Sequence, residues 1–311
     1  ASLLERDGTL PVNVKFIIEG EEEIGSPNLA PFLRDNTEKL KADVLVVSDS
    51  AMYAPGRPSL VYGLRGLAYL QIDLRGADSD LHSGIFGGAV PNPALELCKI
   101  LAQLKDERGR ITVPGFYDKV CDMTPDERAA YAQLDFDPEE LRESVGVKEL
   151  TPEKGYNALE SRTARPTLEV NGLLAGYTGE GAKTVLPAKS MAKISCRLVP
   201  DQDPDEIAQL LEQHIQSLCH PSMKCTVQNM HGAQPWITPP DHPALEAAAR
   251  AVRSVFGREP VRIREGGSIP IVIDFQEILG LPGILLGFGL NDENLHAPNE
   301  HFRIENFFGG I

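Results

Sequence analysis

The chain has 311 residues, of which 42% are hydrophobic, so it is long enough for two domains with substantial cores. A formal net charge of −15 and a pI near 4.9 argue against a nucleic-acid partner and against binding to anionic membranes. The longest apolar run is too short to cross a bilayer, and the N-terminus lacks the pattern of a secretory signal, so no membrane association is expected.

Strand-length apolar runs alternate with helical patterns near the start of the chain. Residues 12–20 (VNVKFIIEG) and 42–50 (ADVLVVSDS) are predicted as strands, and the second one reads as buried on both faces. Residues 26–42 between them are predicted as a helix, with Ser26 as the N-cap and Pro27 in the first turn. This alternation is typical of an α/β fold.

The pattern changes after residue 58. Residues 59–76 alternate apolar and polar positions, which is typical of antiparallel strands with one exposed face. The remaining expected elements are helices at 92–107, 203–218, 242–256 and 269–279, and strands at 183–200, 223–230, 260–265 and 282–289. A charged, irregular stretch covers 107–165 and contains short capped helices such as 124–134.

These changes in pattern predict a two-part organisation. An outer α/β module with a mostly parallel sheet comprises residues 1–60 and 237–311, and an inserted α+β module comprises residues 61–236. Open α/β sheets place their sites beyond the carboxyl ends of the strands, so polar loops that follow outer strands are candidate site residues.

Two adjacent carboxylates, Glu22 and Glu23, follow the first predicted strand. An acidic triplet is more often a solvated turn. At a strand end, however, one carboxylate can bind a metal ion while its neighbour faces the open position and takes a proton from water. Asp49 and His296 also follow outer strands, although a lone Asp there is usually a turn former and a lone His a surface residue. Together, a Glu, an Asp and a His form a ligand set suited to zinc or manganese.

Three further positions have both an ordinary and a functional interpretation. His82 is either a loop histidine or a catalytic group, and the turn at Gly267 and Ser268 is either structural or a ligand contact before a helix. Arg197 lies on an apolar strand, where an arginine usually forms a salt bridge and less often clamps a carboxylate. Five cysteines without a CxxC pair are typical of reduced thiols, so a cytoplasmic location is expected.

Seven motifs, taken in order, resemble the M20 family of metallopeptidases, and most closely its dipeptidase branch of carnosinase-like and cysteinylglycine dipeptidases. The resemblance extends from about residue 10 to residue 303. The motifs are EGEEEIGS, VVSDS, YGLRG, DLHSGIFGG, KTVLPAKSMAKISCRLVP, REGGSIP and LHAPNE.

The resemblance implies a role for each candidate residue. Glu22 matches the general base, and Glu23, Asp49 and His296 match ligands of two divalent ions, zinc or manganese, with cobalt also suitable. His82 matches a histidine that acts in trans on the active site of the other subunit of a homodimer. Residues matching contacts to a small peptide substrate are Thr184, Arg197, Gly267 and Ser268.

The resemblance also implies a catalytic domain at 1–60 and 237–311 and a lid and dimerisation domain at 61–236. The family's upstream His-x-Asp pair and bridging Asp have no counterpart in this sequence, so we expect a large fragment that alone holds metal poorly and has little or no activity. The implied function is hydrolysis of dipeptides or short peptides. Two alternatives stay open, an N-acyl amino acid deacylase of the same fold and a non-catalytic dimeric scaffold.

Overall fold

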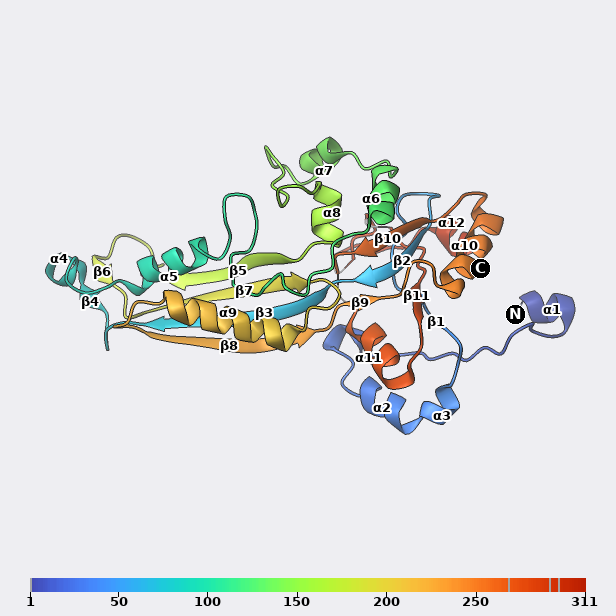
Figure 1. Ribbon diagram of the computed structural model, residues 1–311, viewed down its shortest axis with the longest axis horizontal. Helices are drawn as coiled ribbons and strands as arrows, with labels where there is room; N and C mark the ends of the chain where they lie inside the picture. Colours follow the sequence, from blue (N-terminus) through green and yellow to red (C-terminus); the bar gives the residue numbers. More distant parts are fainter. Residues whose placement is uncertain (1, 268, 291, 296) are drawn as a thin grey trace.

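The computed structural model describes residues 2–267, 269–290, 292–295 and 297–311. The molecule is elongated, with a long antiparallel sheet extending from a second sheet that is surrounded by helices (Figure 1). We call the first the arm sheet and the second the central sheet. No helix in the described part of the chain is long and apolar enough to cross a membrane.

The central sheet combines both ends of the sequence. Its core strand is β2 (Ser59–Leu64), every residue of which is buried. The pairings β1–β11 and β2–β10 are parallel, whereas β11–β2 and β2–β9 are antiparallel. The predicted α/β class is therefore confirmed, with a sheet of mixed direction. The other strands are β1 (Leu45–Val47), β9 (Trp236–Ile237), β10 (Val261–Glu265) and β11 (Gly283–Leu285).

Successive residues of β2 point to opposite faces of the central sheet, so both faces carry apolar side chains. Helices cover both faces. Leu60 and Tyr62 pack with one apolar stripe of α10 (Pro243–Phe256), and Val61 packs with Val272 on the other side. Val272 belongs to α11 (Pro270–Leu279), whose Phe275 also packs against two short helices near the N-terminus. The remaining helices of this part are α1 (Ser2–Asp7), α2 (Leu29–Asp35), α3 (Thr37–Leu40) and α12 (Ile304–Gly310).

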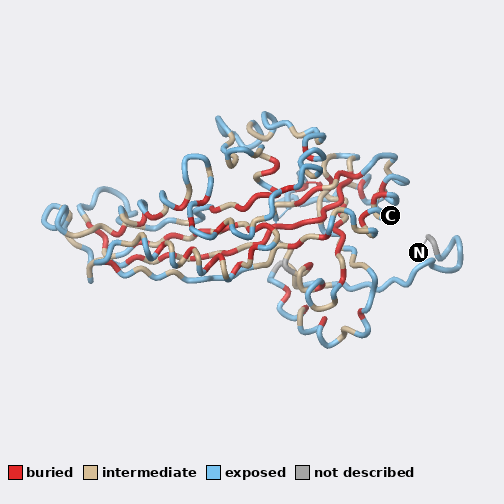
Figure 2. Tube along the Cα trace, viewed as in Figure 1, coloured by how far each residue is buried: buried red, intermediate tan, exposed pale blue. Residues whose placement is uncertain are grey.

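The arm sheet has the strand order β5-β7-β3-β8, and all of its pairings are antiparallel. Along β3 (Gly66–Arg75), buried and half-buried residues alternate, as the sequence predicted for a sheet with one covered face. The covered face packs against α5 (Pro93–Ala102) and α9 (Pro204–Leu218), and Figure 2 shows the resulting buried layer along the arm. The other strands are β5 (Thr167–Ala175), β7 (Lys189–Leu198) and β8 (Lys224–Ala233).

Helix α9 forms where the sequence predicts it because the sequence contains an N-capping residue and a row of apolar residues along one face of the helix. The Asp203 side chain accepts hydrogen bonds from the backbone N–H groups of Asp205 and Glu206, and Pro204 occupies the first turn. The buried residues Ile207, Leu211 and Ile215 recur every four positions and pack onto the sheet.

Short elements occupy the two ends of the arm. At its base lie α6 (Pro125–Ala132), α7 (Pro138–Ser144) and α8 (Ala158–Thr163), within the irregular stretch in which short capped helices were predicted; α6 matches the one expected at 124–134. At its tip, on the far left of Figure 1, lie β4 (Leu81–His82), α4 (Ser83–Phe86) and β6 (Val185–Leu186), with β4 and β6 paired.

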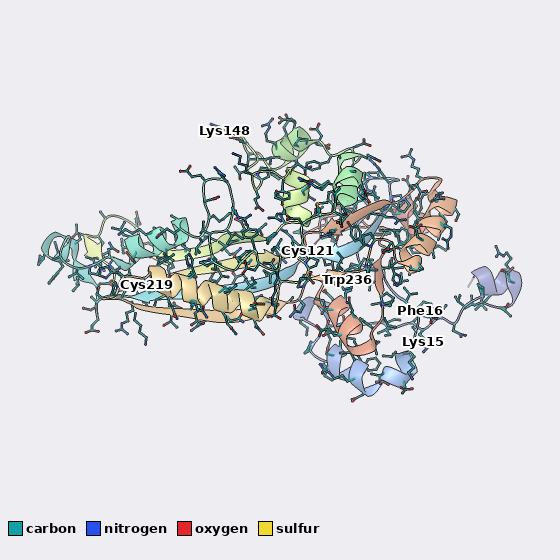
Figure 3. All side chains as sticks on the ribbon, viewed as in Figure 1. Lys15, Phe16, Cys121, Lys148, Cys219 and Trp236 are labelled. Carbon is teal, nitrogen blue, oxygen red and sulfur yellow. The ribbon has the colours of Figure 1, made fainter. Side chains whose placement is uncertain are left out.

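Three predictions near the N-terminus were wrong. Residues 12–20 form no strand but an extended, exposed segment, in which Phe16 is 86% and Ile18 is 95% exposed (Figure 3 labels Phe16). No described strand lies beside the segment to pair with its backbone, and a strand exists only through such pairing. The helix predicted from residue 26 begins at Leu29 with Asn28 as its N-cap, and β1 is half exposed instead of buried on both faces.

Candidate active site

A cavity of about 1520 Å³ opens at the junction of the central sheet and the base of the arm. Its wall includes the loop after β1, the turn after β10, parts of α7 and α8, and the loop that follows β11. Polar loops at strand ends were predicted to carry the site, and the charged groups on this wall include Asp49, Arg65, Arg162, Glu265 and Glu293.

The loop that carries Asp49 is fixed by its neighbour across the sheet. The Ser50 hydroxyl accepts a hydrogen bond from the Gly287 N–H at 2.9 Å, and the Met52 N–H donates to the Gly289 carbonyl at 2.8 Å. The two segments are so close that a Cβ atom on Gly287 would lie 1.6 Å from the Ser50 carbonyl oxygen. Asp49 is therefore held at the cavity wall by backbone packing on both sides.

Glu265, the last residue of β10, is the most perturbed carboxyl group in this cavity. Burial raises the pKa of its carboxyl to about 7, the charge of Arg162 opposes the rise, and the charge of Asp49 adds to it. The influence of Asp49 shows that two carboxyl groups share one electrostatic environment. Such crowding of negative charge is the setting in which a cation is favourable.

Arginines balance this acidic group. Arg65, at the end of β2, is 9% exposed and donates hydrogen bonds to the carbonyl oxygens of Gly266, at 3.1 Å, and Arg165, at 3.2 Å. Burial and the nearby charges of Arg197 and Arg162 lower its pKa to about 10. Arg197 was predicted to contact a substrate carboxylate, and its charge lies close to that of Arg65. Three guanidinium groups at the base of the arm provide an environment suited to an anion.

The predicted residues Glu22 and Gly267 lie in different settings. Gly267 lines the cavity, whereas Glu22 is half-buried in the 3₁₀ turn η1 (Glu22–Ile24) and is not among the residues on the cavity wall. Neighbouring Glu21 has a structural partner, since Asn28 donates to both of its carboxylate oxygens at 3.0 and 2.9 Å. Gly25 closes the turn with φ at +87°, a conformation that favours glycine.

Several predicted ligands are not described. The side chain of Glu23, and the residues Ser268 and His296, lie outside the described part of the structure. Among the residues that are described, no three His, Cys, Asp or Glu side chains converge as a metal site would require. The predicted set of Glu23, Asp49 and His296 therefore stays a prediction.

His82 and Thr184 lie together, but far from the cavity. The His82 Nε2 atom is 3.5 Å from the Thr184 hydroxyl, and the His82 Nδ1 atom accepts a hydrogen bond from the Gly84 N–H at 3.1 Å. Both residues are exposed at the tip of the arm, at the opposite end of the arm sheet from Arg197. One chain therefore brings His82 next to Thr184, and the charge of Arg197 close to Arg65 on the cavity wall, but does not bring the two groups together.

Sequence reasoning did not assign roles to Glu265, Arg65 and Arg162, although two of them lie in quoted motifs. Glu265 precedes the glycines of REGGSIP, and Arg65 lies in YGLRG. The available signal was a charged residue at the carboxyl end of an apolar strand, which is the same signal that singled out Asp49.

Comparison with known proteins matches the chain to one peptidase family and to dipeptidases. The profile of the family described as Peptidase family M20/M25/M40 matches residues 1–311. The Cys-Gly metallodipeptidase of Schizosaccharomyces pombe is 37% identical over 306 residues, which cover 97% of this chain and 64% of that protein. The human Beta-Ala-His dipeptidase is 35% identical over 312 residues, covering 99% of this chain and 61% of that protein.

Solved structures agree with these matches. The crystal structure of an M20 family metallo-carboxypeptidase from Sulfolobus solfataricus is 36% identical and superposes with a TM-score of 0.83, covering 99% of this chain and 70% of that one. The chain thus spans less than two thirds of the length of the two curated relatives named above.

Proposed function

Because this chain belongs to peptidase family M20/M25/M40, we propose that the whole protein is a metal-dependent enzyme that hydrolyses dipeptides or short peptides. The observation that carries the proposal is the cavity in which Asp49 and Glu265 lie near a group of arginines. A dipeptide has a scissile bond between an ammonium and a carboxylate group, so it matches a wall that bears both signs of charge. The names of the two curated relatives, both dipeptidases, support this substrate class.

The donor set fits a divalent metal ion. Carboxylate and imidazole groups suit zinc, manganese and cobalt, and the charges of Asp49 and Glu265 are close enough for the first to raise the pKa of the second. We assign Glu23, Asp49 and His296 as the residues that would hold two such ions. When bound, these ions supply a Lewis acid that polarises the carbonyl and acidifies water.

The chain's own residues provide the remaining steps. Glu22 takes a proton from the attacking water and passes it to the leaving amine. His82 donates a hydrogen bond to the oxygen of the tetrahedral intermediate. Arg197 binds the substrate carboxylate, and Gly267 and Ser268 lie beside the substrate backbone.

The position of His82 supports a homodimer. Since His82 and Thr184 are adjacent at the tip of the arm and remote from Asp49, we propose that both reach the cavity of the partner subunit. We also propose an inserted dimerisation domain between the two parts of a catalytic domain. The sequence put the insertion at 61–236 and the catalytic domain at 1–60 and 237–311, but β2 (Ser59–Leu64) and β9 (Trp236–Ile237) belong to the central sheet, so the proposed insertion begins after residue 64 and ends before residue 236. The five free thiols, two of them exposed, support a cytoplasmic location.

The deciding experiment measures hydrolysis by the whole protein after chelation and reloading with zinc or manganese. A free dipeptide and its N-acetylated counterpart are offered in parallel. We expect cleavage of the free dipeptide that is lost on chelation and reduced by a factor on the order of 10³ in Glu22→Gln, because the general base is removed. Glu21→Gln is the matched control and should retain activity, since Glu21 contacts Asn28.

Other outcomes separate the alternatives. Preference for the acetylated substrate assigns the protein to the N-acyl amino acid deacylases. Absence of turnover on both substrates, with no metal retained, identifies a non-catalytic scaffold. Full activity of Glu22→Gln removes that residue from the proposed mechanism.

A further inference from the structure

The loop between β11 and α12 forms part of the cavity wall, and a buried carboxylate ties its two ends together. We call residues 290–303 the cavity loop. Glu293 lies on the cavity wall and is only 2% exposed. Its Oε2 atom accepts a hydrogen bond from the Leu290 N–H at 2.9 Å, and its Oε1 atom accepts one from the Arg303 N–H at 3.1 Å. Because Arg303 is the N-cap of α12, one side chain joins the start of the loop to the helix that follows it.

The backbone of Glu293 is fixed within the same loop. Its N–H donates to the Leu290 carbonyl oxygen at 3.2 Å, and its own carbonyl oxygen accepts from the His301 N–H at 3.1 Å. Glu293 therefore makes four hydrogen bonds to other residues of the cavity loop. Both carboxylate oxygens are buried and engaged by backbone N–H groups, so this residue acts through the loop and does not touch the substrate.

Two residues of the cavity loop have an uncommon backbone conformation. Asn294 and Asn299 have φ angles of +56° and +65°, in the left-handed region that residues other than glycine rarely adopt. Such conformations persist where surrounding contacts hold them, and they are frequent at functional sites. The hydrogen bonds of Glu293 span both positions and are contacts of this kind.

The same carboxylate lies beside the segment that carries Asp49. A Cβ atom on Gly289 would lie 3.2 Å from the Glu293 Oε2 atom, and the Gly289 carbonyl oxygen accepts a hydrogen bond from the Met52 N–H at 2.8 Å. Glu293 is therefore placed where the cavity loop meets the loop after β1.

We infer that Glu293 is a positioning residue for the active site. It holds the cavity loop in one arrangement and thereby sets the position of the metal ligand proposed at residue 296, so the inference rests on the proposed function. His296 itself lies outside the described residues. Metal–ligand distances tolerate deviations of only about 0.2 Å, so a ligand on a loop depends on the residues that fix that loop.

The test compares Glu293→Ala with a matched variant outside the cavity wall. The Asp106 side chain also accepts hydrogen bonds from two N–H groups of its own loop, those of Arg108 at 2.8 Å and Arg110 at 2.9 Å. The backbone of Asp106 also bonds within that loop, and Asp106 is not among the residues on the wall of the large cavity. Asp106→Ala thus removes a loop carboxylate with the same kind of partners.

The main measurement is the affinity for zinc. The whole protein is stripped with a chelator, and its zinc dissociation constant is measured by competition with a chromophoric chelator. We expect Glu293→Ala to weaken zinc binding by roughly 10- to 100-fold, as when the support of a metal ligand is removed. Asp106→Ala should leave the constant unchanged. Glu293→Gln keeps the length of the side chain and one acceptor oxygen, so its affinity should be intermediate.

A second measurement separates positioning from a general loss of stability. Dipeptide hydrolysis by Glu293→Ala should be low at stoichiometric zinc and should recover in excess zinc, because the ligand is present but poorly placed. Equal zinc affinity in Glu293→Ala and the unsubstituted protein overturns the inference, and so does equal weakening in Asp106→Ala. If the unsubstituted protein neither binds zinc nor cleaves the dipeptide, the proposed function fails and the inference fails with it.

Hydrogen exchange in the unsubstituted protein provides a test even if a variant fails to fold. The N–H groups of Leu290, His301 and Arg303 are all hydrogen-bonded to Glu293. Peptides that contain them should therefore exchange slowly in the metal-free whole protein. Unprotected exchange throughout the cavity loop would show that Glu293 does not hold it, and would overturn the inference.

Discussion

A single arginine side chain connects three remote parts of the sequence. Arg65 leaves the end of β2 and binds the carbonyl oxygens of Gly266 and Arg165, which are 201 and 100 residues away along the chain. Such hydrogen bonds from a buried charged group are among the stronger ones in proteins. Arg65 therefore fixes the turn after β10, although the sequence alone assigned no role to this residue.

This packing predicts different effects at two adjacent glycines. A Cβ on Gly266 would lie 2.4 Å from the Arg162 carbonyl oxygen and 2.8 Å from the Arg65 guanidinium, whereas nothing lies within 4 Å of one on Gly267. We expect Gly266→Ala to lower the free energy of unfolding by about 1–3 kcal/mol, since backbone must move. Gly267→Ala, measured in the same urea titration, should change it by less than about 0.5 kcal/mol. Equal effects at both positions would contradict this account.

Residue-level prediction from the sequence worked where local position decides and failed where three-dimensional contacts decide. Asp49 was singled out because it follows an apolar strand, and it lies on the cavity wall, while its role as a metal ligand stays a prediction. The raised pKa of Glu265 depends on burial and on Asp49, which is 216 positions away in the sequence. No local pattern encodes such a contact.

Among the elements, helix α6 is joined to the central sheet by Tyr131, which accepts a hydrogen bond from the Arg264 N–H at 2.9 Å, and by the carboxylate of Glu127. Glu127 completes the capping box of α6 with Thr124 and also accepts hydrogen bonds from Tyr62 on β2, at 2.9 Å, and from Arg264 on β10. The side chains of Glu127 and Arg264 are only 10% and 7% exposed. Glu127 therefore caps the N-terminus of α6 and also links this helix to β2 and β10.

Removing this carboxylate should destabilise the fold. Glu127→Gln leaves the Arg264 charge buried without its partner, so we expect the free energy of unfolding to fall by about 3 kcal/mol in urea titrations at pH 7. Glu139→Gln is the matched control, because its ion pair with Arg142 is largely exposed and its loss should cost less than about 1 kcal/mol.

The pH dependence of that difference has a definite sign. Burial alone would raise the pKa of Glu127, but hydrogen bonds from Thr124 and Arg264 outweigh it and hold the pKa below its ordinary value of 4.5. A lowered pKa in the folded state gives stability that is complete above the unfolded value and is lost as the pH falls. The stability gap between the unsubstituted protein and Glu127→Gln should therefore shrink below about pH 4.5. A gap that is constant or grows on acidification would refute this assignment.

Helices were predicted better than strands for a physical reason. Helices α9 and α10 begin at a capping side chain followed by proline, so their sequences contain their own start signals. A strand has no internal hydrogen bonds and depends on its neighbours, which is why the apolar segment 12–20 did not become one. The alternation along β3 was informative because it records the one face covered by α5 and α9.

For the whole molecule, the proposed exchange of His82 between subunits predicts complementation. Glu22→Gln and His82→Ala should each be inactive alone. After unfolding and refolding as an equal mixture, half of the dimers are mixed and each contains one intact site, so activity should return to about a quarter of the unsubstituted level. Refolded single variants are the control. Activity that stays at their level would place both residues in the same site of one chain.

The length of the arm has a mechanical consequence. At about 3.3 Å per residue, the ten residues of β3 make a lever roughly 30 Å long. A rotation of about 5° at its base would displace the tip by roughly 3 Å, as much as a hydrogen bond is long. The position of His82 thus depends on the stiffness of the whole arm. If His82 acts in the partner subunit as proposed, a substitution at the base of the arm would change activity without contacting His82.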